Sequence, residues 1–328
     1  MHRRAFLGAL SAATSALLLP SWAGAAPATK IRGVERTKLG VTFKLALDHA
    51  PFPFAGSPYK DPTTVVFVPS HYRLPANREV DVVLHFHGHN GTAERAITGN
   101  ALREQLFESK QNAILVVPQG PWMAADSSGG KLDQKGGMAR LLTEVRRTMR
   151  GAAASGALGK AALAGAARVG RLCISAHSGG YKVAASCLRH GGVNVDEVYL
   201  FDALYGSVDD FFAWVVARKD ERGGERHKLI SHFAGGATRE NNLDLSRRLE
   251  AAGVRCLHET KPGQLTRAEL TKGRAIFMAS TLVHEAAAYG QNDLRDCLFA
   301  SCLTRTLDST WFEQKREPRT IDARWTPP

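Results

Sequence analysis

The stretch LCISAHSGGYKVAA, residues 172–185, passes from an apolar segment into an Ala-rich one, with an abrupt break at Ser-Ala-His-Ser-Gly-Gly. The apolar part predicts a buried strand over 169–175, and the Ala-rich part predicts a helix. Ser178 therefore lies where a strand turns sharply into a helix. Ala176 and Gly180 suit such a turn, because the central residue is strained and its neighbours must let two backbones come close.

Short apolar runs alternate with longer helical patterns on both sides of this turn. Eight runs predict strands, at residues 41–47, 64–69, 80–86, 113–118, 169–175, 196–201, 228–234 and 274–280. Helical spacing predicts helices at 93–109, 137–150, from 179 onward, 208–219 and 242–253. Repeated strand–helix units predict an α/β fold, with a mainly parallel sheet and helices on both faces. The Ala/Gly-rich segment 151–170 is either a frayed helix end or a surface loop.

Composition places the chain among globular proteins. Its 328 residues are 44% apolar, which is enough for a large core. The formal net charge is +12, but Lys and Arg are scattered. The densest cluster, at Arg146, Arg147 and Arg150, has no interleaved aromatic residues. We therefore expect a solvated basic surface and no nucleic-acid partner.

The first residues have the pattern of an export signal. Paired arginines precede a moderately apolar run at 6–19, and an A-x-A cleavage pattern follows. We predict a signal peptide over 1–25 and a mature domain over 26–328. The signal resembles the twin-arginine type, although His2 stands where Ser or Thr is usual. The run is shorter than the about 20 apolar residues of a membrane span, so we expect no stable membrane anchor. The expected location is the periplasm or medium of a bacterium, with the export machinery as partner.

The five cysteines do not form a recognisable framework. Cys173 and Cys187 lie in apolar stretches and are predicted to be small buried hydrophobic residues. No C-x-x-C spacing occurs, which disfavours a zinc knuckle. Spacing alone leaves open whether Cys297 and Cys302 form a disulfide.

A second glycine-containing motif, HFHGHNGT at 85–92, follows the third predicted strand. Acyl transfer needs hydrogen-bond donors aimed at the developing oxyanion. The N–H of Gly179 and that of Gly88 or His89 are the candidate donors.

The same motif leaves a metal-site hypothesis open. His85, His87 and His89 alternate, so all three side chains could face one side and bind zinc. An H-x-H metal pair usually has Asp and His shortly afterwards, whereas Asn90 and Gly91 stand here. We therefore favour the oxyanion loop and expect no metal.

A serine nucleophile also needs a base and an acid. His284 follows the last predicted strand and is the candidate base for Ser178. Asp202 directly follows the strand at 196–201 and is the favoured acid, because a charge in so apolar a stretch usually has a partner. Glu240 and Asp244 remain alternatives.

The turn AHSGG, the His87-Gly88 loop, His284 and the strand order together resemble the α/β-hydrolase superfamily, over roughly residues 36–295. The turn resembles the nucleophile elbow G-x-S-x-G, with Ala176 in the first small position. The resemblance implies a single domain of about eight strands and a Ser-His-acid hydrolase that needs no cofactor. Only residues 203–227 lie where relatives often carry a lid, so we expect no large lid.

The leading hypothesis is an exported serine hydrolase that cleaves a small-molecule or polymeric carboxylic ester. Alternatives are a periplasmic peptidase or amidase of the same fold, a zinc hydrolase using the histidine motif, and a non-catalytic binding protein. Four aromatic residues near the predicted strand ends are candidates to line an acyl or aromatic pocket. They are Trp122, Tyr181, Phe201 and Tyr205.

Overall fold

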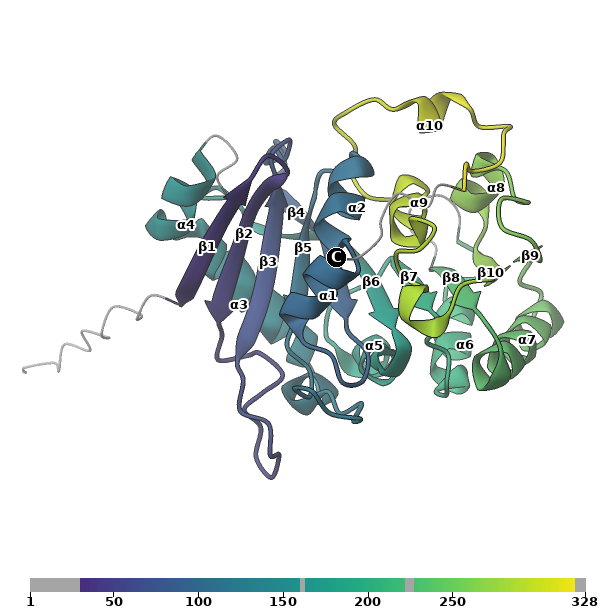
Figure 1. Ribbon diagram of the computed structural model, residues 1–328, viewed down its shortest axis with the longest axis horizontal. Coiled ribbons are helices and arrows are strands. Elements are labelled where there is room, and N and C mark those ends of the chain that lie inside the picture. The colour runs from purple at the N-terminus through teal and green to yellow at the C-terminus, as the bar shows by residue number, and fades with distance from the viewer. Residues whose placement is uncertain (1–29, 160–162, 222–226, 322–328) are drawn as a thin grey trace, which may run out of the picture.

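A computed structural model describes residues 30–159, 163–221 and 227–321, and it is built around one sheet (Figure 1). The sheet has ten strands in the order β1-β2-β3-β5-β4-β6-β7-β8-β10-β9. The strands are β1 Ile31–Thr37, β2 Gly40–Ala46, β3 Thr63–Pro69, β4 Glu79–Phe86, β5 Ala113–Pro118, β6 Arg168–His177, β7 Glu197–Phe201, β8 Lys228–Phe233, β9 Cys256–Glu259 and β10 Ala275–Ala279. The predicted signal peptide lies outside the described residues and stays a prediction.

The eight predicted strands are all present, but the expected number of about eight is too low. β1 and β9 are additional strands at the two edges of the sheet. β1 is largely exposed and polar, and β9 has only four residues, so neither shows an apolar run. Strands β5, β4, β6, β7, β8, β10 and β9 are parallel, and β3 is antiparallel to both of its neighbours.

Ten helices in the described residues cover the two faces of the sheet. They are α1 Ala93–Gly99, α2 Leu102–Glu108, α3 Gly137–Arg150, α4 Ala152–Leu158, α5 Tyr181–His190, α6 Val208–Val216, α7 Gly236–Ala251, α8 Arg267–Lys272, α9 Asp293–Phe299 and α10 Thr310–Glu313. The buried apolar residues of α3 to α7 join one cluster, and those of α1, α2, α8, α9 and α10 join the other. In Figure 1, α1 and α2 lie in front of the sheet and α3 behind it.

Two helical predictions need correction. The helix expected over 93–109 is two helices, because Ala101 takes a left-handed conformation with φ of 46°. The helix expected from 242 begins earlier, at Gly236. The Ala/Gly-rich segment left open at 151–170 contains a separate short helix, α4.

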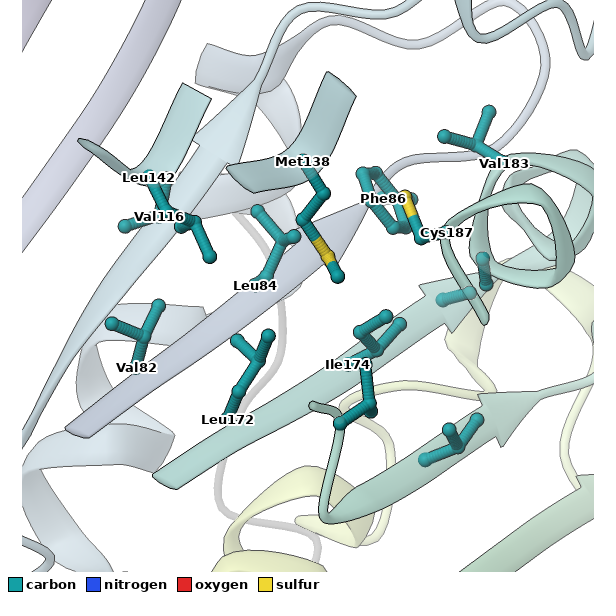
Figure 2. Packing of buried hydrophobic residues seen from close by; sticks show 14 of the residues in the cluster. Val82, Leu84, Phe86, Val116, Met138, Leu142, Leu172, Ile174, Val183 and Cys187 are labelled. Atoms are coloured by element: carbon teal, nitrogen blue, oxygen red, sulfur yellow. The ribbon is translucent and has the colours of Figure 1, made fainter. Parts of the chain in front are cut away.

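Burial on both faces explains the continuous apolar runs of the central strands. On β4, Leu84 packs toward Met138 and Leu142 of α3, as Figure 2 shows. Its neighbour Val83 points the other way, into the second cluster. A strand covered on both sides is buried at successive positions, and β4 is buried from Val80 to Phe86, including the polar Asp81 and His85.

These features make up a single-domain α/β-hydrolase fold, as the sequence predicted. In the described part of the β7–β8 connection, α6 is the one helix, in line with the expectation of no large lid. No helix in the described ranges has the length and hydropathy needed to cross a membrane. All five cysteines are free thiols, so Cys297 and Cys302 are not paired.

Candidate active site

Ser178 occupies a strained turn at the carboxyl end of β6. It opens the short 3-10 helix η3 (Ser178–Gly180), which leads directly into α5, and its φ is 52°. A non-glycine residue in this left-handed region is strained and commonly marks a functional site. The small neighbours are required. A Cβ on Gly88 would lie 2.7 Å from the Ser178 Cβ, and one on Gly180 would lie 2.6 Å from the carbonyl oxygen of Phe86.

The predicted base contacts this serine, and the predicted acid contacts the base. His284 lies in the 3-10 helix η5 (His284–Ala286), which follows β10. Its Nε2 is 2.8 Å from the Ser178 Oγ, and its Nδ1 is 2.7 Å from Oδ2 of Asp202. The carboxyl ends of β6, β7 and β10 thus bring together three residues that are far apart in the sequence.

The Asp202 carboxylate is buried and firmly held. Its Oδ1 accepts hydrogen bonds from the backbone N–H of Ala234, at 3.1 Å, and from the hydroxyl of Thr238. Burial alone would raise the pKa of Asp202, but the hydrogen bonds from His284, Thr238 and Ala234 hold it below its usual value. Asp202 is therefore ionised near neutral pH. Sequence reasoning missed Thr238 and Ala234, because a hydroxyl and a backbone N–H carry no motif of their own.

The two alternative acids lie elsewhere. Glu240 is exposed on α7, and Asp244 forms ion pairs with Arg247 and Arg248 of the same helix. Neither carboxylate contacts His284, whereas Asp202 does. The choice among the three carboxylates is decided by the tertiary structure.

The pH dependence of catalysis is expected to follow His284. The hydrogen bond from Asp202 raises the pKa of His284 above its ordinary 6.5, against the opposing effect of burial. Because a general base must be neutral, kcat/KM is expected to fall as the pH drops through this raised pKa. Initial rates with a chromogenic ester between about pH 5 and pH 9 measure it. An acid limb centred below the ordinary histidine value would contradict the pairing with Asp202.

The loop after β4 is braced by His87. Its Nε2 accepts a hydrogen bond from the backbone N–H of Gly120, at 2.9 Å, and its Nδ1 lies 2.8 Å from the carbonyl oxygen of Gly88. This network assigns the proton to Nδ1, which donates to that carbonyl. Burial lowers the pKa of His87, so the imidazole is neutral, as these bonds require. His87 thus holds Gly88 against the nucleophile.

The predicted oxyanion residues surround Ser178. A Cβ on Gly179 would lie 2.3 Å from the His89 ring, so the loop packs tightly on the residue after the nucleophile. The exposed His89 is hydrogen bonded to Ser127, with 2.7 Å between its Nε2 and the serine Oγ. The structure therefore gathers the loop residues Gly88 and His89 close to Ser178 and Gly179.

The zinc hypothesis has no geometric support. His85 contacts Ser175 inside the sheet, while His87 and His89 have the separate partners described above. In the described part of the chain, only Cys173, Glu197 and Cys302 form a group of three possible metal ligands within 4.8 Å of one another. That group contains none of the three histidines, so they do not form a candidate metal centre.

Of the four aromatic candidates, two are exposed and one is buried in the core. The side chains of Trp122 and Tyr205 are exposed, at 58% and 43%. The Tyr205 hydroxyl lies 3.3 Å from Nδ1 of His284, and its ring lies 6.3 Å from that of Tyr181. Phe201 is fully buried in the core, so the expectation that it lines a pocket is wrong.

No model of a known protein family matches the sequence, and no curated protein matches it either. Solved structures resemble the chain only weakly. An S-formylglutathione hydrolase from Agrobacterium tumefaciens is 12% identical, with 81% of this chain and 96% of that chain covered and a TM-score of 0.45. A feruloyl esterase module from Clostridium thermocellum is 11% identical, with 87% and 95% covered and a TM-score of 0.45. Likenesses this weak say nothing about the activity of this chain. The geometry of its own site is the evidence for function.

Proposed function

We propose that this chain, which has the α/β-hydrolase fold, hydrolyses carboxylic esters through an acyl-enzyme intermediate on Ser178. One observation carries the proposal. The buried Asp202, His284 and Ser178 form an unbroken hydrogen-bonded chain that ends on a strained serine. A serine hydroxyl is a weak nucleophile, and this chain is the arrangement that activates it.

The chemistry proceeds in two halves. The Ser178 Oγ attacks the ester carbonyl carbon while Nε2 of His284 takes its proton, and the carbonyl oxygen becomes an oxyanion. The N–H of Gly179 and that of Gly88 or His89 stabilise the oxyanion. When the intermediate collapses, the C–O bond to the alcohol breaks, and the alcohol leaves with the proton from His284.

Water then releases the acyl group. His284 takes a proton from water, the hydroxide equivalent attacks the acyl carbon, and the Ser178 Oγ leaves and recovers its proton from His284. The products are a carboxylic acid and the free enzyme. Throughout both halves Asp202 stays ionised, orients the imidazole and stabilises its positive charge.

Labelling with a fluorophosphonate probe tests the proposal, because the probe bonds only to activated serines. We expect the wild-type protein to be labelled and Ser178→Ala to remain unlabelled. Ser127→Ala is the matched control, since Ser127 is another serine hydrogen bonded to an imidazole and lies close to Gly179. It should still be labelled. A folded wild-type protein that resists the probe, or a labelled Ser178→Ala, would overturn the assignment.

A panel of nitrophenyl esters beside the matching nitroanilides then tests the bond cleaved. We expect turnover of the esters. Turnover of the anilides at comparable kcat/KM would instead make the enzyme an amidase or peptidase with the same nucleophile.

We also propose that residues 1–25 direct export and are removed. The paired arginines, the apolar run and the A-x-A pattern support this proposal. Expression of the full chain in a bacterium with a twin-arginine pathway should give periplasmic protein whose intact mass lacks these residues. Changing Arg3 and Arg4 to lysine should leave the precursor in the cytoplasm. Full-length protein in the periplasm would contradict cleavage, and unchanged export of the double variant would contradict the pathway.

A further inference from the structure

His177, the residue before the nucleophile, lies beside the base. Successive side chains of a strand point to opposite faces of a sheet, so His177 shares a face with Ser175 and Cys173. Cys173 belongs to the apolar cluster under α9, and His284 lies on the segment that leads into that helix. The Nε2 of His177 is 2.9 Å from the backbone carbonyl oxygen of His284. A carbonyl can only accept, so Nε2 must carry the hydrogen.

His177 lies between the ring of His284 and the loop that carries Gly88. The rings of His177 and His284 have centroids 5.0 Å apart and an interplanar angle of 30°. On the other side, a Cβ on Gly88 would lie 3.3 Å from Nδ1 of His177. His177 therefore fills the space between the oxyanion loop and the base, and it contacts both.

Apart from this contact, the backbone around His284 is held mainly by hydrogen bonds within its own turn. It is a single turn of 3-10 helix, and the preceding Val283 is 68% exposed. The His284 carbonyl accepts one further hydrogen bond, from the backbone N–H of Ala287 at the longer distance of 3.3 Å. The His177 contact is thus the shorter of the two hydrogen bonds to the backbone oxygen of the base.

We propose that His177 is a positioning residue for His284. Through its Nε2–H it holds the backbone of the base, so that Nε2 of His284 meets the Ser178 hydroxyl. This inference rests on the proposed function. A displacement of about 1 Å in a catalytic group can cost about a hundred-fold in rate, so a hydrogen bond to the backbone of the base has kinetic consequences.

Both the neutral and the protonated imidazole can donate from Nε2, but catalysis favours a neutral His177. Burial lowers the pKa of His177. His284 lowers it further, while the bond to the His284 carbonyl and the charges of Asp202 and Glu285 raise it. His85, on the neighbouring strand, also faces it. A protonated His177 would repel the imidazolium that forms on His284 during catalysis.

Two variants separate positioning from packing. In His177→Gln the amide nitrogen can take the place of Nε2 and donate to the same carbonyl, whereas His177→Met has comparable length and no donor. We expect kcat of His177→Gln to stay within about 3-fold of wild type, and kcat of His177→Met to fall about 10- to 100-fold with little change in KM. Thermal melts confirm that both variants are folded.

The outcomes are distinct. Wild-type kcat in a folded His177→Met, or equal loss in both variants, would overturn the hydrogen-bonding role. If His177→Met does not fold, long-range proton–nitrogen NMR spectra of the wild-type protein test the proposal instead, because they report the tautomer of His177. An Nε2–H tautomer at His177 is expected, and an Nδ1–H tautomer would overturn the proposal. Failure of the proposed function would be seen separately, as a wild-type protein that the fluorophosphonate does not label.

Discussion

Asp202→Asn is expected to lower kcat about ten-thousand-fold while the protein stays folded. The reason lies in the partners of this carboxylate. Oδ1 faces two donors, the N–H of Ala234 and the hydroxyl of Thr238. An asparagine will point its carbonyl oxygen at these donors, which leaves its NH2 group facing Nδ1 of His284. The imidazole must then accept at Nδ1 and carry its proton on Nε2, where it cannot take the proton of Ser178.

Steady-state kinetics with the best ester of the panel measure this effect. Glu240→Gln and Asp244→Asn are the matched controls, because they neutralise the two other carboxylates that the sequence offers. Both should keep wild-type kcat, since Glu240 is exposed and Asp244 pairs with arginines of its own helix. A large loss in either control with little loss in Asp202→Asn would show that the acid is misassigned.

Arg319→Met is expected to destabilise the protein by about 3–5 kcal/mol. The Arg319 guanidinium is buried, 2.7 Å from Glu259, 3.3 Å from Asp293 and 3.5 Å from Asp296. Removing it leaves carboxylates in the interior without this cation, and Arg295 pairs with only one of them at 3.0 Å. Replacing one partner of a buried ion pair is costly for this reason, whereas exposed pairs contribute little.

The destabilisation should depend on pH. Burial raises the pKa values of Asp293 and Asp296 from 3.8 to about 6. Arg319 lowers both pKa values in the folded protein, so without it they lie higher still. The variant therefore holds protons that the wild type has released, and the stability difference should grow as pH rises through about 6 and above. Urea unfolding at pH 5 and pH 7 measures it. Arg168→Met, which removes a largely exposed ion pair with Glu79, is the control and should change stability little. A similar small effect at Arg319 would contradict the buried network.

Much of the site could be predicted from local sequence, because its geometry is largely local. A strand that runs into a helix through small residues places Ser178 at a sharp turn. The apolar run, the small residues and the Ala-rich run that produce this turn are consecutive in the sequence. The His87-Gly88 motif likewise follows its own strand without a break. His284 was harder to choose, since the chain has twelve histidines. It was chosen because the resemblance to α/β-hydrolases places the base after the last strand.

The supporting contacts could not be predicted, because they depend on which strand ends are neighbours. Ala234 and Thr238 follow β8 and contact Asp202 at the end of the neighbouring strand β7. His177 contacts the backbone of a residue 107 positions away. Backbone groups and hydroxyls form such contacts without any preferred sequence. The zinc hypothesis failed for the same reason, since alternation along the chain did not bring the three imidazoles to a common point.

The sequence by itself determined the central strands of this protein, the main helices and the serine turn. Strands buried on both faces need mostly apolar runs, and a sharp turn needs small residues. Both features can therefore be recognised in a short stretch of sequence. Only the tertiary structure decided the edge strands β1 and β9, whose pairing needs backbone hydrogen bonds to one neighbour and little apolar surface. It also decided the acid among three carboxylates, because parallel packing aligns the ends of β6, β7 and β10 and leaves Glu240 and Asp244 on the outer side of a helix.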